Sequence, residues 1–173
     1  MTIRKILTEP DPFLRQKSKD IEIVDNGIRN LMDDMLDTMY AAPGIGLAAI
    51  QVGIPKRIIV IDLSKEEEKK PLYFVNPKII LKSDSNATYE EGCLSVPGQF
   101  AEIDRPDKCH VNYLDYNGKQ QEIKAEGLLA TCIQHEIDHL EGILFIDYLS
   151  KLKKNYIVKK LSKQKKILER IVV

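Results

Sequence analysis

Residues 134–139 of the chain read QHEIDH, within an apolar-periodic segment that extends from residue 125 to residue 142. Side chains four positions apart share one face of a helix, so this spacing predicts that His135 and His139 project together, one turn apart. Two neutral imidazoles so placed can bind one metal ion, and the carboxylate of Glu136 can then reach a water on that ion. The pattern favours the metal site of a hydrolase over two structural histidines that share a helix by chance.

Length and composition indicate an ordinary globular protein, which we expect to form a single catalytic domain over residues 1–173. With 43% hydrophobic and 30% charged residues, the chain can bury a core without disulfides. No apolar run is long enough for a membrane span, and the first residues lack the apolar core of a signal peptide, so we expect a cytoplasmic monomer that does not bind membranes. Three cysteines are too few for a disulfide framework, which fits a reducing compartment.

Charge is unevenly distributed along the chain. The formal net charge of zero argues against a surface built throughout to bind nucleic acid. Residues 151–173 nevertheless carry nine basic side chains and one acidic one, which leaves 17 basic and 25 acidic side chains in residues 1–150. The body is therefore acidic and the C-terminal segment basic.

Periodicity elsewhere predicts an α+β fold, with mainly antiparallel strands around the central helix and a further helix at the C-terminus. The expected elements are a helical turn at 13–17, a helix capped by Asp25 and ending near Tyr40, strands at 57–63 and 72–81, an exposed loop at 64–70, a hairpin of 110–116 with 119–124, and a helix from about 150 to 170. Asn76-Pro77 interrupts the second strand and indicates an edge position or a bulge. On the last helix we expect Leu149, Leu152, Leu161 and Leu168 to face the core.

A small-residue segment, PGIGLAAIQ at 43–51, follows the first long helix. Its glycines and alanines indicate a backbone that bends sharply or that another group approaches closely. The segment lacks the Gly-Lys-Ser/Thr ending of a phosphate loop. The amide of Gln51, beside this segment, could donate a hydrogen bond to a substrate oxygen.

Two histidines leave a metal underbound, so the chain should supply a third donor. Downstream candidates are poor, since Phe145 stands where one protease pattern has a histidine and Glu169 lies near the end of the basic segment. Upstream, Cys93 lies in EGCLSVPG at 91–98, and its thiolate would be a strong ligand. We interpret Cys109 and Cys132 as small buried side chains, although Cys132, one turn before Glu136, can line the same pocket.

Three segments together, GIGLAAIQ at 44–51, EGCLS at 91–95 and QHEIDH at 134–139, resemble the signature segments of the bacterial peptide deformylases in order and approximate spacing. The resemblance extends over essentially the whole chain, and EGCLS with the helical C-terminus resembles the type common in Gram-negative bacteria. It implies a metal-dependent hydrolase that removes the N-formyl group from the N-terminal formylmethionine of newly made polypeptides and releases formate.

The resemblance also implies a role for each matching residue. It makes Cys93, His135 and His139 the ligands of one divalent metal ion, Fe(II) by expectation, with zinc or nickel also accepted. It makes Glu136 the general base and assigns stabilisation of the oxyanion to the Gln51 side chain and the Leu94 backbone N–H. The residues it implies for substrate binding are Gly44, Ile45, Gly46, Glu91, Thr131 and Cys132. Of these, Glu91 is also the best candidate for a structural carboxylate.

Some features leave alternatives open. Phe100 and Gly98 replace an arginine and a charged residue found in other members, so preference beyond formylmethionine is not determined. The basic C-terminal segment is either a solvated helix face or a contact for ribosomal RNA. A zinc endopeptidase is a competing interpretation, disfavoured by the upstream cysteine ligand. A non-catalytic binding module is another, and it would need neither Glu136 nor Gln51.

Overall fold

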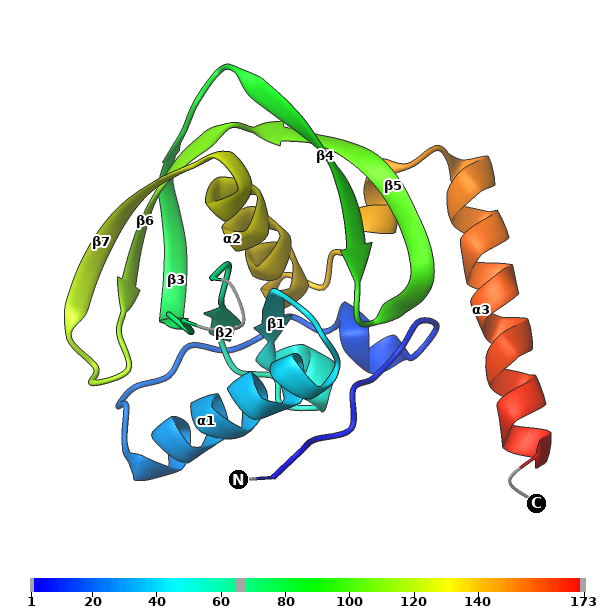
Figure 1. Cartoon of the computed structure of the whole chain (residues 1–173), viewed down its shortest axis with the longest axis horizontal. Coiled ribbons are helices and arrows are strands. Elements are labelled where there is room, and N and C mark those ends of the chain that lie inside the picture. The colour runs from blue at the N-terminus through cyan, green and yellow to red at the C-terminus, as the bar shows by residue number, and fades with distance from the viewer. Residues whose placement is uncertain (1, 65–67, 172–173) are drawn as a thin grey trace.

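The structure, a computed structural model, describes residues 2–64 and 68–171 (Figure 1). The middle of the loop predicted at 64–70 therefore lies outside the described residues. The helices are α1 (Asn26–Ala41), α2 (Gly127–Leu140) and α3 (Lys151–Ile171), with short 3-10 helices η1 (Pro12–Arg15), η2 (Ala49–Val52) and η3 (Phe145–Tyr148). The strands are β1 (Gly46–Ala48), β2 (Ile58–Ile61), β3 (Leu72–Lys82), β4 (Asn86–Cys93), β5 (Val96–Pro106), β6 (Lys108–Leu114) and β7 (Gln120–Glu126).

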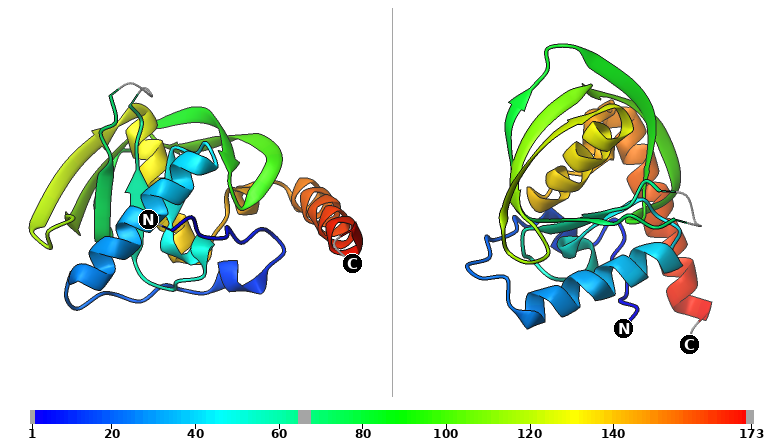
Figure 2. Two further views of the ribbon diagram at one scale, coloured as in Figure 1. Left: turned by 60° about the horizontal axis from the view of Figure 1, so that its bottom comes forward. Right: turned by 60° about the vertical axis from the view of Figure 1, so that its left-hand side comes forward.

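The strands form two antiparallel sheets that curve around α2 (Figures 1 and 2). The larger sheet has the order β1-β2-β3-β6-β7, and β4 pairs with β5 in the smaller one. Side chains of the larger sheet, such as Phe74 and Val111, pack with Ile133 and Leu140 of α2 in one buried cluster. The predicted fold class, antiparallel strands around the central helix with a C-terminal helix, is confirmed.

Helix α2 is buried on almost every side, which explains why its sequence is apolar around most of the cylinder. Ile133 and Leu140 are fully buried, and even His139 is only 1% exposed. The helix begins at Gly127, whose φ of +60° is readily adopted by glycine, so β7 can turn directly into α2. Polar side chains on this helix therefore point into the protein interior and not into solvent.

Two local predictions can be compared directly with the structure. Asp25 caps α1, because its side chain accepts a hydrogen bond of 2.9 Å from the backbone N–H of Ile28. Asn76-Pro77 marks a shift of register in β3, between Val75 and Lys78. Since β3 lies between β2 and β6, the bulge interpretation is confirmed and the edge interpretation is wrong.

The β4–β5 hairpin and strand β1 were not predicted. β4 is mostly polar and belongs to a two-stranded sheet, so it lacks the apolar run that identifies a buried strand. β1 has only three residues, within the small-residue segment. These elements matter for function, because β4 ends at Cys93 and β1 begins at Gly46.

Helix α3 packs against the body through a narrow contact and then projects beyond it (Figures 1 and 2). Ile157 and Leu161 are buried against β5 and η3. Leu152 and Leu168 are 82% and 64% exposed, so the prediction that they face the core is wrong. Leu152 lies on a different face of α3 from Ile157 and Leu161, and Leu168 lies beyond Leu161, the last buried residue of that helix. Within the described residues, no helix combines the length and apolar character needed to cross a membrane.

Candidate metal centre and its cavity

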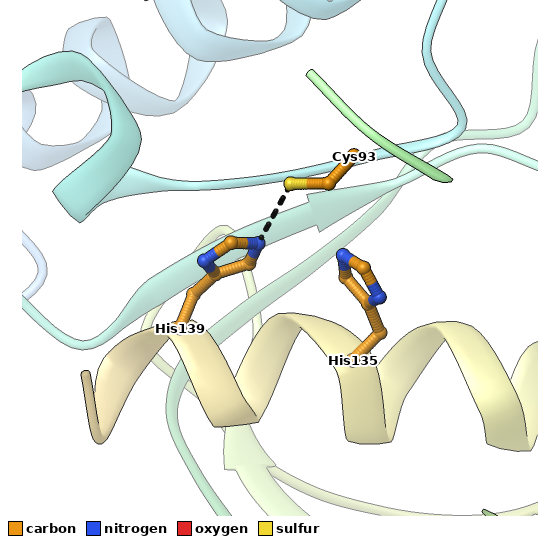
Figure 3. A group of neighbouring side chains, drawn as sticks. All are labelled: Cys93, His135 and His139. Atoms are coloured by element: carbon orange, nitrogen blue, oxygen red, sulfur yellow. Dashed lines mark hydrogen bonds between the residues drawn. The ribbon is translucent and has the colours of Figure 1, made fainter. Parts of the chain in front are cut away.

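Three potential metal donors converge between α2 and the end of β4 (Figure 3). His135 and His139 project from one face of α2, and Cys93 reaches them from the other side. Sγ of Cys93 lies 3.2 Å from Nε2 of His139, and one donor atom from each residue lies within 4.8 Å of the others. Ligands of one tetrahedral ion are roughly 3.5 Å apart, so this set of one sulfur and two nitrogens fits a single divalent metal ion.

A carboxylate behind His135 sets the orientation of its ring. The Nδ1–H group of His135 donates a 2.8 Å hydrogen bond to Oε2 of Glu91, which leaves Nε2 to face the metal site. Both side chains are buried. Burial raises the pKa of Glu91, but hydrogen bonds from His135 and Arg105 outweigh it and hold that pKa below its ordinary value. Glu91 therefore stays ionised as a fixed partner for the histidine.

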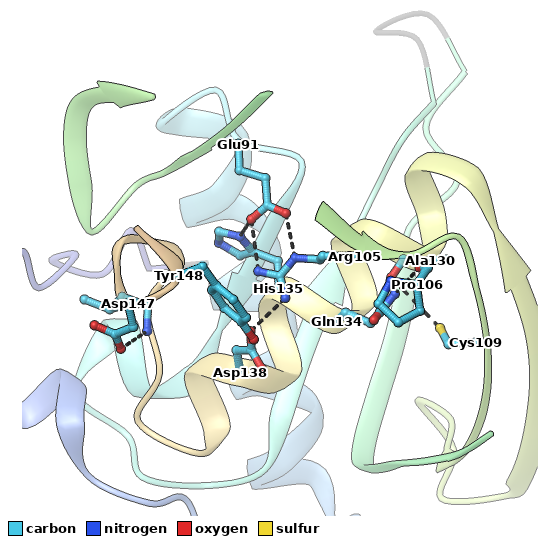
Figure 4. A network of polar contacts seen from close by, with 11 residues as sticks. Glu91, Arg105, Pro106, Cys109, Ala130, Gln134, His135, Asp138, Asp147 and Tyr148 are labelled. Carbon is cyan, nitrogen blue, oxygen red and sulfur yellow. Dashed lines mark hydrogen bonds and ion pairs between the residues drawn. The ribbon is translucent and has the colours of Figure 1, made fainter. Parts of the chain in front are cut away.

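Arg105 extends this arrangement into a buried network (Figure 4). Its guanidinium contacts both oxygens of Glu91, at 2.6 and 3.0 Å, and donates to Asp138 at 2.8 Å. The hydroxyl of Tyr148 completes the set by donating to Asp138 at 2.7 Å. Strand β5, helix α2 and η3 are thereby joined behind the histidine. Sequence reasoning missed Arg105, because only the fold brings β5 next to α2.

Glu136 lies beside the donors with a carboxylate that is almost fully buried. Among the described residues its Oε2 atom has no hydrogen-bond partner. Burial raises the pKa of Glu136 to about 7. Gly46 of β1 makes room for the carboxylate, since a Cβ atom there would lie 2.9 Å from Cδ of Glu136. An unpartnered carboxyl oxygen facing a cavity can exchange a proton with a bound molecule.

Gln51, in η2, brings an amide to the opposite side of the site. Its Oε1 accepts a 2.8 Å hydrogen bond from the Ala48 N–H, and its Nε2 donates to Oγ of Ser95 at 3.0 Å. The same nitrogen lies 3.5 Å from Sγ of Cys93. Leu94 follows Cys93, and its side chain packs close to Gly44. The side-chain N–H groups of Gln51 thus point toward the donor cluster.

These groups line one cavity of about 450 Å³. All the residues that the resemblance implied for substrate binding contribute to its walls, namely Gly44, Ile45, Gly46, Glu91, Thr131 and Cys132. Gly98 and Phe100 also line it, as does Leu128, which sequence reasoning missed. His139 is buried and is not among the lining residues. The cavity therefore brings together three segments that are far apart in the sequence.

The remaining cysteines differ from Cys93 in their surroundings. Cys109 is buried under the sheet away from the cavity, and burial raises the pKa of its thiol to about 11. Cys132 lines the cavity, but burial raises the pKa of its thiol to about 12. Both thiols are thus held protonated near neutral pH, whereas Cys93 lies among the metal donors.

Comparison with known proteins identifies the family. The family model described as polypeptide deformylase matches residues 3–155. The chain belongs to this family. It is 69% identical to a peptide deformylase of Pelagibacter ubique, with 100% of both chains covered. It is 57% identical to a peptide deformylase of Rhizobium meliloti, with 96% of each covered. Both organisms are Gram-negative, in agreement with the predicted type.

Solved structures agree with this family. A crystal structure of peptide deformylase from Ehrlichia chaffeensis is 45% identical, covers 96% of this chain and 98% of that one, and superposes with a TM-score of 0.91. The same enzyme in complex with actinonin is 48% identical, with 95% and 98% covered and a TM-score of 0.91. The activity of the chain is therefore peptide deformylation, a metal-dependent hydrolysis that removes the N-formyl group from newly made polypeptides.

Proposed function

We propose that Cys93, His135 and His139 bind one divalent metal ion, Fe(II) in the cell, and that the site hydrolyses N-formylmethionyl peptides to formate and a free N-terminus. The observation that carries the proposal is the convergence of the three donors beside a carboxyl oxygen of Glu136 that has no partner in the described part of the chain. Zinc or nickel would also suit this mixed sulfur and nitrogen set. When bound, the ion supplies Lewis acidity for the formyl carbonyl and for the attacking water.

Glu136 is the proton carrier in this proposal. Its carboxylate takes a proton from the attacking water and then delivers that proton to the nitrogen of the leaving methionine. Burial supports both steps, because it raises the proton affinity of the carboxylate without pairing it to a fixed cation. Gly46 supports them as well, because it leaves space for the Glu136 carboxylate to move from the attacking water to the nitrogen of the leaving methionine.

Gln51 and Leu94 stabilise the charge that develops on the formyl oxygen. The Gln51 amide is held at its oxygen by Ala48, so its N–H groups face the cluster. The backbone N–H of Leu94, next to Cys93 in the β4–β5 turn, is the second donor that we assign. Donors held in place before the reaction need no reorganisation when the oxyanion forms.

The peptide substrate binds as an added strand beside Gly44–Gly46. In the described part of the chain β1 pairs only with β2, so its other edge is free to pair with a peptide. The methionine side chain enters the cavity beside Ile45, Thr131 and Cys132, and Glu91 supports the wall from behind. The actinonin complex of the Ehrlichia relative supports a ligand site in this fold.

The test is an anaerobic assay of the full chain on formyl-Met-Ala and on unformylated Met-Ala, with metal analysis of the same sample. We expect formate release from the first peptide only, with one iron per active chain. Cleavage of the Met-Ala bond in either peptide would instead support a zinc endopeptidase. Metal binding without formate release would support a non-catalytic binding module.

We further propose that the chain acts in the cytoplasm as a monomer of one domain, residues 1–173, and that the basic face of α3 associates weakly with the ribosome. Support comes from the nine basic side chains after residue 150 and from the projection of α3 away from the body. Replacing Lys163, Lys165 and Lys166 by Glu should weaken salt-sensitive ribosome binding without changing the fold, since all three are exposed. Unchanged binding would exclude this contact.

A further inference from the structure

Ser95 is fully buried in the turn that joins β4 to β5, and it contacts both sides of the metal centre. Its hydroxyl oxygen accepts the 3.0 Å hydrogen bond from Nε2 of Gln51. Its backbone N–H donates to Sγ of Cys93 at 3.4 Å. One residue therefore connects the amide donor with the sulfur donor. None of the roles assigned so far includes its side chain.

The hydroxyl of Ser95 determines how the Gln51 amide is presented. An amide group offers one acceptor oxygen and two N–H donors. The oxygen is taken by the Ala48 N–H, and one N–H is taken by Ser95. With both ends held, the amide plane is fixed, and the same nitrogen also lies 3.5 Å from Sγ of Cys93, so its second N–H faces the metal donors.

The backbones on which these two side chains stand are also held, by the N-terminal arm, residues 2–11. The N–H of Leu7 donates to the carbonyl of Gln51 at 2.7 Å. Two residues later, the N–H of Glu9 donates to the carbonyl of Ser95 at 2.8 Å. Alternate residues of one extended segment thus fix the separation of η2 from the β4–β5 turn. The side-chain hydrogen bond then completes the alignment of the amide.

We propose that Ser95 is a positioning residue, whose hydroxyl holds the Gln51 amide in the orientation that stabilises the oxyanion. This inference rests on the proposed role of Gln51. Because the substrate is held by other groups, loss of the hydroxyl should slow turnover and leave KM nearly unchanged. Because the backbone N–H remains in every variant, the environment of Cys93 should also remain.

The first experiment uses the full chain loaded with Zn(II), with Ser95→Ala as the variant. We expect kcat to fall about 10- to 100-fold, with KM and zinc content unchanged, since a small misplacement of a catalytic group has effects of this size. Side-chain amide NMR gives a readout independent of activity. The hydrogen-bonded NH₂ signal of Gln51, identified by its loss in Gln51→Ala, should move toward the position of a free amide. Ser18→Ala removes another buried hydroxyl and should change neither kcat nor the Gln51 signal.

A matched pair of variants covers the case in which Ser95→Ala does not fold. Ser95→Thr and Ser95→Val add the same bulk, but only threonine keeps the hydroxyl. We expect the threonine variant to be about 10-fold faster than the valine variant, the lower end of the same range. Equal rates in the two variants, or an unchanged Gln51 signal in Ser95→Ala, would overturn the role of the hydroxyl.

A double variant separates this inference from the function on which it rests. If Ser95 acts through Gln51, Ser95→Ala should add less than about 2-fold to the loss already caused by Gln51→Ala, because the two effects are not independent. If the loss of kcat in the double variant equalled the product of the two single losses, the inference would be overturned and the role of Gln51 would stay intact. Full activity of Gln51→Ala would instead overturn the proposed role of Gln51 itself.

Discussion

The carboxylate of Glu91 lies 2.8 Å from Nδ1 of His135, and this contact links the metal centre to a buried network. A histidine whose second nitrogen is fixed by a carboxylate keeps its ring orientation and its basicity as a ligand. Glu91 in turn receives both its other hydrogen bonds from Arg105. We therefore expect metal affinity to depend on β5, which holds Glu91 through Arg105 but contributes no residue to the donor cluster.

Removing this carboxylate should weaken metal binding without removing a ligand. We expect Glu91→Ala to lower Zn(II) affinity about 10- to 100-fold, the usual effect of losing such a partner. Competition with a chromogenic chelator measures it. Glu102→Ala, an exposed site on the neighbouring strand, is the control. Equal affinity of the Glu91→Ala and Glu102→Ala variants would contradict a role for Glu91 at the metal.

Replacing the proposed proton carrier should separate chemistry from metal binding. Glu136→Gln keeps the shape of the side chain but cannot accept the proton, so kcat should fall by about 10²- to 10⁴-fold. Metal content should stay the same, because Glu136 is not among the donor cluster. Glu126→Gln, exposed at the start of α2, should behave as wild type. A Glu136→Gln variant with full activity would refute the mechanism.

Gly46 should tolerate no side chain at the active site. In Gly46→Ala the new methyl group would lie 2.9 Å from Cδ of Glu136, so the carboxylate must move. We expect a large loss of kcat and a destabilisation of about 1–3 kcal/mol from the overpacking. Steady-state kinetics and urea unfolding measure the two effects. Gly27→Ala, in the first turn of α1 and outside the cavity lining, should keep full activity, and equal kinetics in both variants would contradict the expected contact.

The carboxyl of Asp147 should contribute to the free energy of unfolding at neutral pH and lose this contribution in acid. Burial raises the pKa of its carboxyl, but hydrogen bonds from Lys154 and Arg15 outweigh it and hold that pKa below the ordinary value of 3.8. A depressed pKa stabilises the fold above the ordinary value, and the contribution is lost as the pH falls through the lower value of the folded state.

The comparison with Asp147→Asn tests this directly. The variant should be less stable than wild type at pH 7, and the difference in free energy of unfolding should shrink as the pH falls below about 4. Taking the difference between two proteins removes shared effects such as metal release. Asp84→Asn changes an exposed carboxyl and should show no such trend. If the difference in free energy of unfolding between wild type and Asp147→Asn grew in acid, the pKa of Asp147 would not be lowered by folding.

Local patterns in the sequence determined the central helix, because the four-residue spacing of His135 and His139 puts them on one face whatever surrounds the helix. The cap at Asp25 was also predictable, since it depends only on backbone groups within the first turn of the helix. At Asn76-Pro77 the sequence left an edge position and a bulge open, and the place of β3 between β2 and β6 decided for the bulge. Cys93 and Gln51 were candidates from their residue types, and the resemblance, carried by three motifs, gave them the roles of metal ligand and oxyanion donor.

Only the tertiary structure decided which distant groups meet at that helix. The network of Glu91 and Arg105 requires β4, β5 and α2 to lie together, and no spacing along the chain encodes that meeting. Ser95 gains its role only because the N-terminal arm holds η2 beside the β4–β5 turn. The exposure of Leu152 and Leu168 has the same origin, since an apolar residue on a helix is buried only where another element covers its face.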